Sequence, residues 1–336
     1  MTDTTATIGL IRGDGIGPEI TDSTLRVLDA AGAQVEWKEL LAGQPATDSV
    51  GTPMPESTIA EANELGVVLK GPMTTPVGGG HRSPNVTLRR AMDLYANVRP
   101  IRALPGLRCV APEADMVIVR ENTEGLYAGI ERETDEGAEA IARVTRDGSE
   151  RVVRFAFEHA RAHGRDKVTI LHKANILKKS SGLFLRIGQE VAKDYPDIEC
   201  ADLIIDAACM KMVMYPEMFD VVVTTNLFGD IISDLGAGLV GGLGLAPGAN
   251  IGAGKAMFEA VHGTAPDIAG QGVANPTALL MAAAQMLTFV GQDAVARRVH
   301  AGVLAALHNR RTRTRDLGGK LNTAEFTGAV IAHLGE

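Results

Sequence analysis

Two aspartates, Asp230 and Asp234, stand four residues apart in the run TTNLFGDIISD. On a helix this spacing puts both carboxylates on one face, one turn apart. The preceding run FDVVVTT (Phe219–Thr225) is typical of a strand, so we expect the helix to begin near Leu227. Carboxylates beyond the carboxyl end of a strand lie where ligands bind α/β sheets, and hard oxygen donors suit Mg²⁺ or Mn²⁺. Taken alone, the same residues fit a solvated acidic face nearly as well.

Arginines recur in the run SPNVTLRRAMDLYANVR (Ser83–Arg99) and at the end of the strand-like run VIVR that follows it. The planar guanidinium group binds a carboxylate through two hydrogen bonds, so this set suits a substrate with two or three carboxylates. We interpret Arg90 as a surface residue, and Asn122 and Glu124 as residues that shape a loop. The candidates for substrate binding are then Arg89, Arg99 and Arg120.

Tyr127 and Lys173 are candidate proton carriers. Lys173 directly follows the strand-like run VTILH, at the edge of the sheet where an active site is expected. A lysine whose charge is disfavoured by a nearby metal or by arginines has a lowered pKa and can accept a proton. Asp206, which we expect to end its own strand, adds a third carboxylate. The alternatives are a solvent-exposed lysine and a half-buried tyrosine with a packing role.

The chain of 336 residues is longer than one core usually supports, which predicts two domains. A formal net charge of −8 argues against a nucleic-acid partner, and the one basic cluster, Arg310–Arg315, is interpreted as a solvated loop. We find neither an apolar run long enough to span a membrane nor a signal-peptide pattern. The three cysteines are odd in number and lack metal-ligand spacing, which predicts reduced thiols in a cytoplasmic protein.

Apolar runs that alternate with helical patterns predict a parallel α/β architecture. We expect strands at Thr7–Arg12, Gly66–Leu69, Met116–Val119, Lys167–Leu171, Leu203–Asp206 and Val221–Thr225. We expect helices at Pro18–Ala31, Glu150–His163, Ser180–Tyr195, Ala278–Phe289 and Asp293–His308. The carboxyl-terminal third is mostly helical, so we expect it to pack against a sheet that earlier residues supply. The charged, irregular run Leu126–Gly148 is predicted to protrude as an arm.

Two glycine strings are similar to nucleotide-binding motifs but lack their context. Gly236, Gly238 and Gly241 have the dinucleotide spacing, yet they follow a helical segment instead of a strand. We interpret them as a helix end and a tight loop. The run GDGIG (Gly13–Gly17) follows a strand and precedes a helix, but its spacing differs, so it predicts a sharp strand-to-helix turn. A nicotinamide cofactor would therefore bind by another route.

Seven longer motifs are spread along the chain between Gly13 and Pro276. They are GDGIGPE (Gly13–Glu19), KGPMTTP (Lys70–Pro76), MDLYANVRP (Met92–Pro100), RENTEGLYAG (Arg120–Gly129), HKANI (His172–Ile176), TTNLFGDIISD (Thr224–Asp234) and HGTAPDIAGQGVANP (His262–Pro276). In this order they resemble the β-decarboxylating dehydrogenases, the family of isocitrate, 3-isopropylmalate, homoisocitrate and tartrate dehydrogenases.

The resemblance implies a fold with two α/β domains, a sheet unlike the Rossmann type and a protruding dimerisation arm. The larger, cofactor-binding domain would comprise residues 1–98 and 249–336. The smaller domain, residues 99–248, would bind substrate and form the dimer interface, with the arm near residues 126–148. It also implies a homodimer with shared active sites, whose assembly beyond the dimer the sequence leaves open.

The resemblance also assigns roles to single residues. Asp230 and Asp234 would bind Mg²⁺ or Mn²⁺ together with Asp206 of the partner subunit. Tyr127 and the partner subunit's Lys173 would form the catalytic acid/base pair, with Asp206 relaying the proton. The residues that would bind the substrate carboxylates are Arg89, Arg99 and Arg120. The implied reaction is NAD-linked oxidation of a 2-hydroxy acid followed by loss of CO₂.

Ser83 and Asn85 bear on the substrate. This pair resembles the contacts that isocitrate dehydrogenases make with a third carboxylate, whereas isopropylmalate enzymes carry apolar residues there. Pro84, between the two, departs from the pattern. We therefore predict isocitrate, a small tricarboxylate, with homoisocitrate and 3-isopropylmalate as alternatives. A regulatory subunit without catalysis is the third possibility, and the retained carboxylates, arginines, tyrosine and lysine disfavour it.

Asp267 and Ile268 bear on the cofactor. NADP-dependent relatives tend to have a lysine and a tyrosine at these positions, whereas an aspartate accepts hydrogen bonds from ribose hydroxyls and repels a 2′-phosphate. We therefore predict NAD. The residues predicted to bind it are Thr74, Asn85, His262, Gly263, Thr264, Ala265, Asp267, Ile268 and Asn275.

Overall fold

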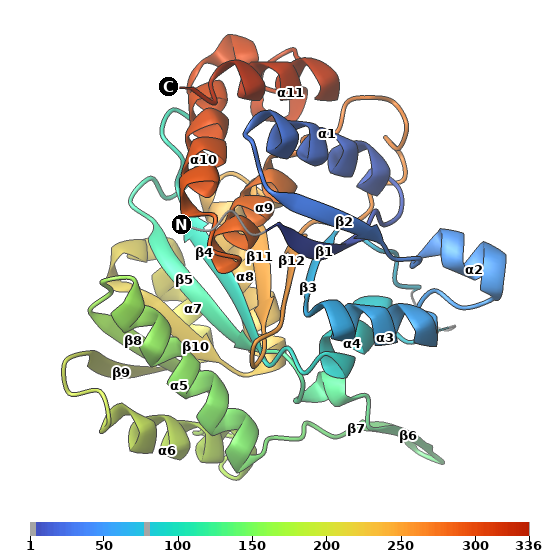
Figure 1. Cartoon of the computed structure of the whole chain (residues 1–336). Helices are drawn as coiled ribbons and strands as arrows, with labels where there is room; N and C mark the ends of the chain where they lie inside the picture. The colour runs from blue at the N-terminus through green and yellow to red at the C-terminus, as the bar shows by residue number, and fades with distance from the viewer. Residues whose placement is uncertain (1–4, 77–80, 336) are drawn as a thin grey trace.

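The computed structural model describes residues 5–76 and 81–335, which form a mixed α/β fold around one large sheet (Figure 1). Ten strands pair in the order β2-β1-β3-β12-β11-β4-β5-β10-β8-β9. Their bounds are β1 (Ala6–Ile11), β2 (Val35–Glu39), β3 (Val67–Lys70), β4 (Ala96–Arg102), β5 (Asp115–Glu121), β8 (Lys167–His172), β9 (Glu199–Ile204), β10 (Val221–Thr224), β11 (Pro247–Ile251) and β12 (Ala256–Ala260). A two-stranded hairpin, β6 (Glu131–Thr134) and β7 (Gly137–Ala140), protrudes from the body.

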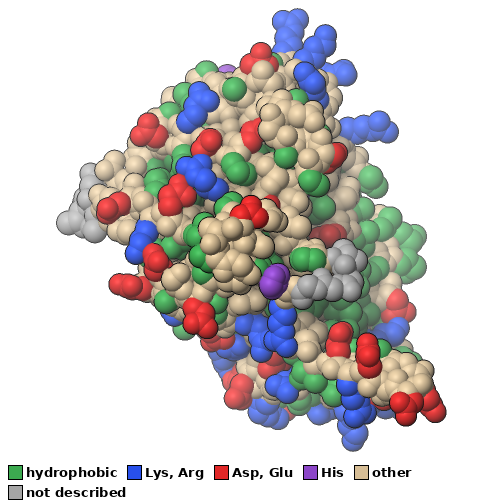
Figure 2. All heavy atoms as spheres, turned by 90° about the vertical axis from the view of Figure 1, so that its right-hand side faces the viewer, with side chains coloured by type: hydrophobic (Ala, Val, Ile, Leu, Met, Phe, Trp, Pro, Cys, Tyr) green, Lys and Arg blue, Asp and Glu red, His purple; other side chains and the backbone are tan. Residues whose placement is uncertain are grey.

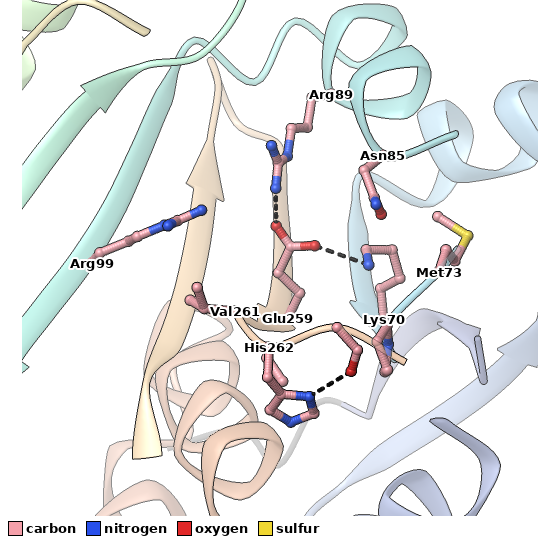
Figure 3. Close-up of a pocket in the computed structure, with 11 residues that line it drawn as sticks. Lys70, Met73, Asn85, Arg89, Arg99, Glu259, Val261 and His262 are labelled. Carbon is pink, nitrogen blue, oxygen red and sulfur yellow. Dashed lines mark hydrogen bonds and ion pairs between the residues drawn. The ribbon is translucent and has the colours of Figure 1, made fainter. Parts of the chain in front are cut away.

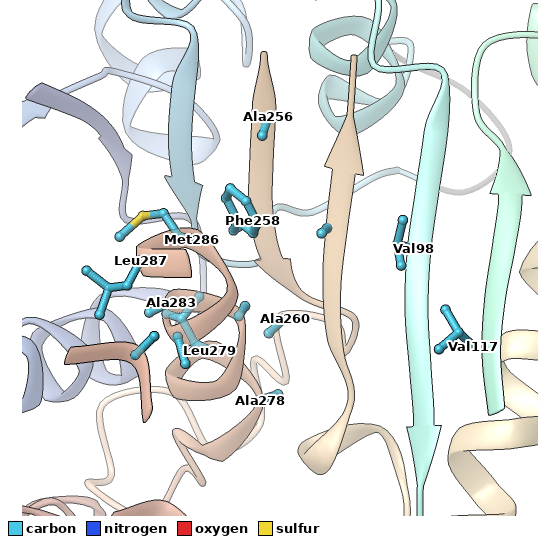
Figure 4. Packing of buried hydrophobic residues seen from close by; sticks show 14 of the residues in the cluster. Val98, Val117, Ala256, Phe258, Ala260, Ala278, Leu279, Ala283, Met286 and Leu287 are labelled. Atoms are coloured by element: carbon cyan, nitrogen blue, oxygen red, sulfur yellow. The ribbon is translucent and has the colours of Figure 1, made fainter. Parts of the chain in front are cut away.

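Helices cover both faces of this sheet. They are α1 (Gly17–Ala30), α2 (Gln44–Val50), α3 (Glu56–Leu65), α4 (Pro84–Ala91), α5 (Arg146–Ala162), α6 (Ser180–Ala192), α7 (Ile205–Met214), α8 (Asn226–Val240), α9 (Thr277–Phe289), α10 (Asp293–His308) and α11 (Thr323–Ala332). The apolar helix α9 packs on β12 and β11, as Figure 4 shows for Leu279 and Met286 beside Phe258. None of the described helices is long and apolar enough to cross a membrane.

The expectation of a purely parallel sheet is wrong at its centre. β4 runs antiparallel to both β5 and β11, and β11 runs antiparallel to β12. Parallel neighbours need a long crossover, usually helical, but β11 and β12 are joined by a short turn. These two strands also belong to the last third of the chain, so its helices pack partly on strands of their own region.

Two further expectations need correction. Asp206 lies in the first turn of α7, because β9 ends at Ile204, the last residue that pairs with β8. Within the predicted solvated loop Arg310–Arg315, Arg313 is buried and donates hydrogen bonds to the carbonyls of Leu307 and Gly106.

The predicted arm forms the hairpin β6–β7, and its last residues already belong to α5. The helix start near Leu227 is confirmed, since α8 begins at Asn226.

Alternation along the strands divides the core between the two faces of the sheet. On β5, Val117 and Val119 join the large cluster under α1, α5 and α9, whereas Met116 and Ile118 join a second cluster with α7 and α8. A third cluster, under α3 and α4, includes Met257 of β12. The second and third clusters lie on the same face, and the side chains between them are polar.

His159 on α5 predicts a pH-dependent loss of stability. Its ring stacks on His163, with ring centroids 4.0 Å apart. Burial, aided by the charges of His163 and Arg165, lowers the pKa of His159 from 6.5 to about 4. Between these values the unfolded chain binds a proton that the folded protein does not, so stability falls as pH falls.

Replacing His159 by phenylalanine should remove this dependence. Between pH 7 and pH 5, wild type should lose about 2 kcal/mol more unfolding free energy than His159→Phe. Urea unfolding at both pH values measures the difference, with the exposed His81→Gln as a matched control. Equal pH dependence in wild type and His159→Phe would refute the assignment.

Candidate functional site

Arg120, at the end of β5, is the best-anchored side chain of the site. It is 1% exposed, and its Nε and Nη2 donate hydrogen bonds to the carbonyl and side-chain oxygens of Asn226, at the start of α8. Its Nη1 pairs with Oδ1 of Asp230, 2.5 Å away. Gly229 makes this approach possible, because a Cβ there would lie 2.4 Å from the Arg120 side chain. The close packing of α8 on β5 therefore places the Asp230 carboxylate next to the end of β5.

Tyr127 and Arg99 also reach Asp230. The Tyr127 hydroxyl donates to Asp230 Oδ2, and the Arg120 guanidinium lies 4.9 Å from the centre of the Tyr127 ring. Arg99 of β4 pairs with both aspartates: its Nη1 lies 3.3 Å from Asp234 Oδ1, and its Nη2 lies 3.7 Å from Asp230 Oδ1. The structure thus brings together five residues that the sequence predicted for the metal, the substrate carboxylates and proton transfer.

The electrostatics of the two aspartates differ. Burial opposes ionisation of Asp230, but the charges of Arg120 and Arg99 outweigh it and hold its pKa below the ordinary value. Burial raises the pKa of Asp234, where the arginines offset it less. Burial also lowers the pKa of Arg120 to about 10, with the neighbouring charge of Arg99 acting in the same direction. Arginines packed this closely repel one another, which favours an anion between them.

Arg89 reaches the site from α4, where it meets two charged residues that the sequence analysis missed. Figure 3 shows Glu259 of β12 between Arg89 and Lys70, with Arg89 Nη2 and Lys70 Nζ at 2.5 and 2.9 Å from its oxygens. All three are at least nine-tenths buried. The two cations hold the pKa of Glu259 well below its ordinary value despite burial. The signal available in the sequence is a single charge in each of two apolar strands, VVLK and AMFEA.

A cavity of about 130 Å³ opens beside this trio (Figure 3). Asn85, Arg89, Arg99 and His262 line it. Asn85 Oδ1, Arg89 Nε and His262 Nε2 are buried and have no hydrogen-bond partner among the residues that the structure describes. Buried polar atoms are rarely left without a partner, so these three indicate a place for a polar ligand. Burial lowers the pKa of His262.

The glycine turn Gly13–Gly17 holds the two loops that flank this cavity. The Asp14 N–H donates to the Pro72 carbonyl, and the Ile16 N–H donates to the Thr264 carbonyl. Gly15 has a φ of +59°, and a Cβ there would lie 2.0 Å from the Thr264 oxygen. The predicted strand-to-helix turn is therefore confirmed, and its glycines permit close packing of backbone on backbone.

Asp14 is expected to control the position of Thr74. Its Oδ2 accepts the Thr74 N–H at 2.8 Å, and its Oδ1 accepts the Gln44 N–H at 2.7 Å. Asp14→Ala removes both bonds to a charged acceptor, so the KM for the cofactor predicted from the sequence, NAD, should rise about tenfold. Steady-state kinetics tests this, with the exposed Asp48→Ala on α2 as control. An unchanged KM in a folded Asp14→Ala protein would contradict it.

Apart from Thr74 and Asn85, which lies on α4, the predicted cofactor residues lie on the loop between β12 and α9. Ala265 has a φ of +39°, an unusual backbone conformation for a residue with a Cβ. Asn275 donates to Asp316 Oδ2 at 2.9 Å, which brings a residue of the carboxyl-terminal segment into the site. Glu19 of α1 accepts the backbone N–H groups of Gly272 and Ala274 and so fixes the far end of the loop.

Within that loop, Asp267 is exposed and Ile268 is half-buried. At the other side of the cavity, the Ser83 and Thr75 hydroxyls lie 3.0 Å apart. Arg90 is exposed, and its side chain donates a hydrogen bond to the Ala128 carbonyl, in line with its interpretation as a surface residue.

Lys173 and Asp206 form a separate pair. Lys173 follows β8, and its Nζ lies 2.5 Å from Asp206 Oδ1, with 69% of the Asp206 side chain exposed. Lys173 lowers the pKa of Asp206. Among the described residues of one chain, no group of three or more His, Cys, Asp or Glu side chains could hold a metal ion. Asp206 therefore does not join Asp230 and Asp234 within one subunit.

Comparison with known proteins places these features in a family. The family model described as isocitrate/isopropylmalate dehydrogenase matches residues 7–330. An isocitrate dehydrogenase from Methylococcus capsulatus has a crystal structure with 54% identity and a TM-score of 0.95, over 98% of this chain and 99% of that one. The NAD isocitrate dehydrogenase catalytic subunit 5 of Arabidopsis thaliana mitochondria is 46% identical over 98% of this chain and 89% of its own length. A 3-isopropylmalate dehydrogenase from Archaeoglobus fulgidus is 47% identical over 97% of this chain and 99% of its own.

Proposed function

The chain belongs to the isocitrate/isopropylmalate dehydrogenase family, and from this premise we propose that it oxidises isocitrate with NAD and releases CO₂ to give 2-oxoglutarate. The observation that carries the proposal is the group of three buried arginines, Arg89, Arg99 and Arg120, around one polar site. Three cations in one pocket suit a substrate with two or three carboxylates. Asn85, whose Oδ1 has no hydrogen-bond partner within the described part of the chain, supports a third polar contact.

The carboxylates of Asp230 and Asp234 fit a divalent metal, because they offer hard oxygens one helical turn apart on a rigid element. Mg²⁺ or Mn²⁺ held there would polarise the C2 hydroxyl group and stabilise negative charge on its oxygen. Arg120, Arg99 and Tyr127 hold Asp230 in place before any ligand arrives. We assign Asp206 of the partner subunit as the third carboxylate.

Proton transfer is assigned to Lys173 and Tyr127. The Lys173 amine would accept the proton of the C2 hydroxyl group while hydride leaves C2 for the nicotinamide, and Asp206 would relay that proton. Loss of CO₂ from the resulting keto acid leaves an enolate. The Tyr127 hydroxyl would then protonate the enolate carbon. The hydrogen bond to Asp230 supports this role, because it aims the hydroxyl group into the arginine-lined site.

NAD is preferred to NADP in this proposal. Asp267 is an exposed carboxylate on the loop that carries His262, Gly263 and Thr264, so it can meet a ribose but would repel a 2′-phosphate. Burial of His262 lowers its pKa, so this ring supplies no positive charge at neutral pH.

A second copy of the chain is the proposed partner. Met210, Val213 and Met214 of α7 and Ile231 of α8 are about half exposed, although all four are apolar. Asp206 lies one turn from Met210 on α7, and Ile231 directly follows Asp230 on α8, so each helix carries exposed apolar side chains near its proposed metal ligands. In a two-fold dimer built on this face, the same surface meets itself, which would bring Asp206 of one subunit to the metal pair of the other.

The domain division stays a prediction that the strand order supports. Strands β2, β1, β3 and β12, at one end of the sheet, come from residues 1–98 and 249–336. Strands β5, β10, β8 and β9, at the other end, come from residues 99–248. Between them, β11 and β4 cross the predicted boundaries. The cytoplasmic location, the reduced state of the cysteines and the lack of a nucleic-acid partner also stay predictions. The face in Figure 2 carries Lys and Arg side chains interspersed with Asp and Glu.

One kinetic experiment tests the reaction, the substrate and the cofactor together. We would measure kcat/KM for isocitrate, homoisocitrate and 3-isopropylmalate with Mg²⁺ or Mn²⁺, each with NAD and with NADP. The proposal predicts a strong preference for isocitrate with NAD. Preference for another of the three acids would agree with the proposed reaction but contradict the proposed substrate. No turnover with any acid would refute the proposed function.

A further inference from the structure

Asn250 of β11 lies at the centre of a buried hydrogen-bond network that the reaction described above does not use. The side chain is 0% exposed and all of its hydrogen-bonding capacity is used. Its Nδ2 donates to Glu259 Oε1 at 2.8 Å and to the Met257 carbonyl at 3.2 Å. Its Oδ1 accepts from Asn97 Nδ2 at 2.8 Å and from Asn122 Nδ2 at 3.0 Å. Such complete pairing fixes the orientation of the amide.

The network joins the two arginines that line the cavity. At one end, Glu259 Oε1 accepts from both Asn250 and Arg89. At the other end, Asn97 Oδ1 accepts from Arg99 Nε at 2.9 Å. A series of hydrogen bonds, which we call the relay, therefore links Arg89 to Arg99 in the order Arg89–Glu259–Asn250–Asn97–Arg99. Every residue of the relay is at least nine-tenths buried.

Sheet register places these amides where they can act as a rigid bridge. Asn250 pairs directly with Asn97, and Asn97 pairs directly with Arg120 on β5. Residues directly opposite in neighbouring strands point to the same face, so three polar side chains form one row across the sheet. The row lies between two apolar clusters, under α7 and α8 on one side and under α3 and α4 on the other.

We infer that Asn250 and Asn97 are positioning residues that set the spacing and orientation of the substrate-binding arginines Arg89 and Arg99. The inference rests on the proposed function, because it takes these arginines as the ones that bind substrate carboxylates. The amides suit this role because they bridge two cations and one carboxylate without adding charge. The side chain of Asn250, whose donors and acceptors are all paired, is held rigidly in one orientation.

The relay predicts a particular kinetic signature. Asn250→Leu removes the bridge while keeping a similar volume, so the KM for the hydroxy acid should rise about tenfold. The kcat should change less than about threefold, because the groups that move protons remain in place. Asn97→Leu should have the same effect, and the double variant should be no worse than either single one, since each breaks the same bridge.

The control is Thr327→Val on α11, which removes equally buried hydrogen bonds to Ser23 and Thr323. It should lower the midpoint of thermal unfolding and leave the KM unchanged. If Asn250→Leu does not fold, Asn250→Ser carries the same test, because a shorter polar side chain leaves room for water.

The outcomes separate the relay from the proposed function. A raised KM with a preserved kcat in folded Asn250 and Asn97 variants supports the relay. Variants that lower thermal stability but keep the wild-type KM overturn it and leave the proposed function intact. A wild-type protein that turns over none of the acids overturns the proposed function, and the relay with it.

Discussion

Asp230→Asn is expected to lower kcat/KM for the hydroxy acid by on the order of 10³-fold, through kcat more than KM. The side chain keeps its shape but loses the charge on which Arg120, Arg99 and Tyr127 converge. Hydrogen bonds to a charged group contribute about 1.5–3 kcal/mol each, and the variant also loses a metal ligand. Steady-state turnover over a range of Mg²⁺ and Mn²⁺ concentrations measures the effect.

The control for Asp230→Asn is Asp220→Asn, just before β10. Asp220 also pairs with an arginine, Arg165, at 2.9 Å, but it lies outside the site. Its replacement should affect stability and leave turnover near wild type. If Asp230→Asn kept full turnover in the native assembly, the chain would instead fit the regulatory-subunit alternative.

The parts of the site that depend on local spacing could be predicted from the sequence. Asp230 and Asp234 share a face because they stand one turn apart on α8, and Lys173 lies at the sheet edge because it follows β8 directly. The turn at Gly13–Gly17 could be predicted for the same reason. Local geometry of this kind needs no knowledge of which strands pair.

The parts that depend on strand pairing could not be predicted. Glu259 meets Arg89 across 170 residues of sequence, and Asn250 meets Asn97 across 153. Both contacts require β11 and β12 to insert between β3 and β4, and neither strand has an alternating or long apolar pattern. A single buried charge such as Lys70 or Glu259 was the only signal, and its partner cannot be identified without the register.

The placement of Asp206 shows a further limit. The sequence places it near a strand end, which is close to its position in the first turn of α7. Within one chain, however, Asp206 forms its ion pair with Lys173. The metal set that the family resemblance implies is therefore complete only if two chains contribute to it.

Mixing two inactive variants is expected to restore activity for this reason. Tyr127→Phe removes the proposed acid next to Asp230, and Lys173→Met removes the proposed base next to Asp206. Each homodimer should lose turnover by on the order of 10²–10⁴-fold, the usual size of a general acid–base contribution. In a mixed dimer with shared sites, one site receives both substitutions and the other receives neither.

The expected recovery follows from two-fold symmetry. With equal amounts of the two chains and free exchange, half of the dimers are mixed and each has one intact site, which gives about a quarter of wild-type activity. Co-expression with two affinity tags isolates the mixed dimer, whose activity should be about half that of wild type.

A second mixture shows whether recovery reflects shared sites. Lys173→Met and Asp206→Ala remove members of the same exposed pair, so each site of their mixed dimer receives one damaged pair. This mixture should stay inactive at every ratio. If Tyr127→Phe and Lys173→Met also failed to restore activity in an isolated mixed dimer, each subunit would have to complete its own site. Lys173 and Asp206 would then have to move to Asp230 within one chain. The exposed apolar side chains of α7 and α8 would in that case have no proposed role in a dimer interface.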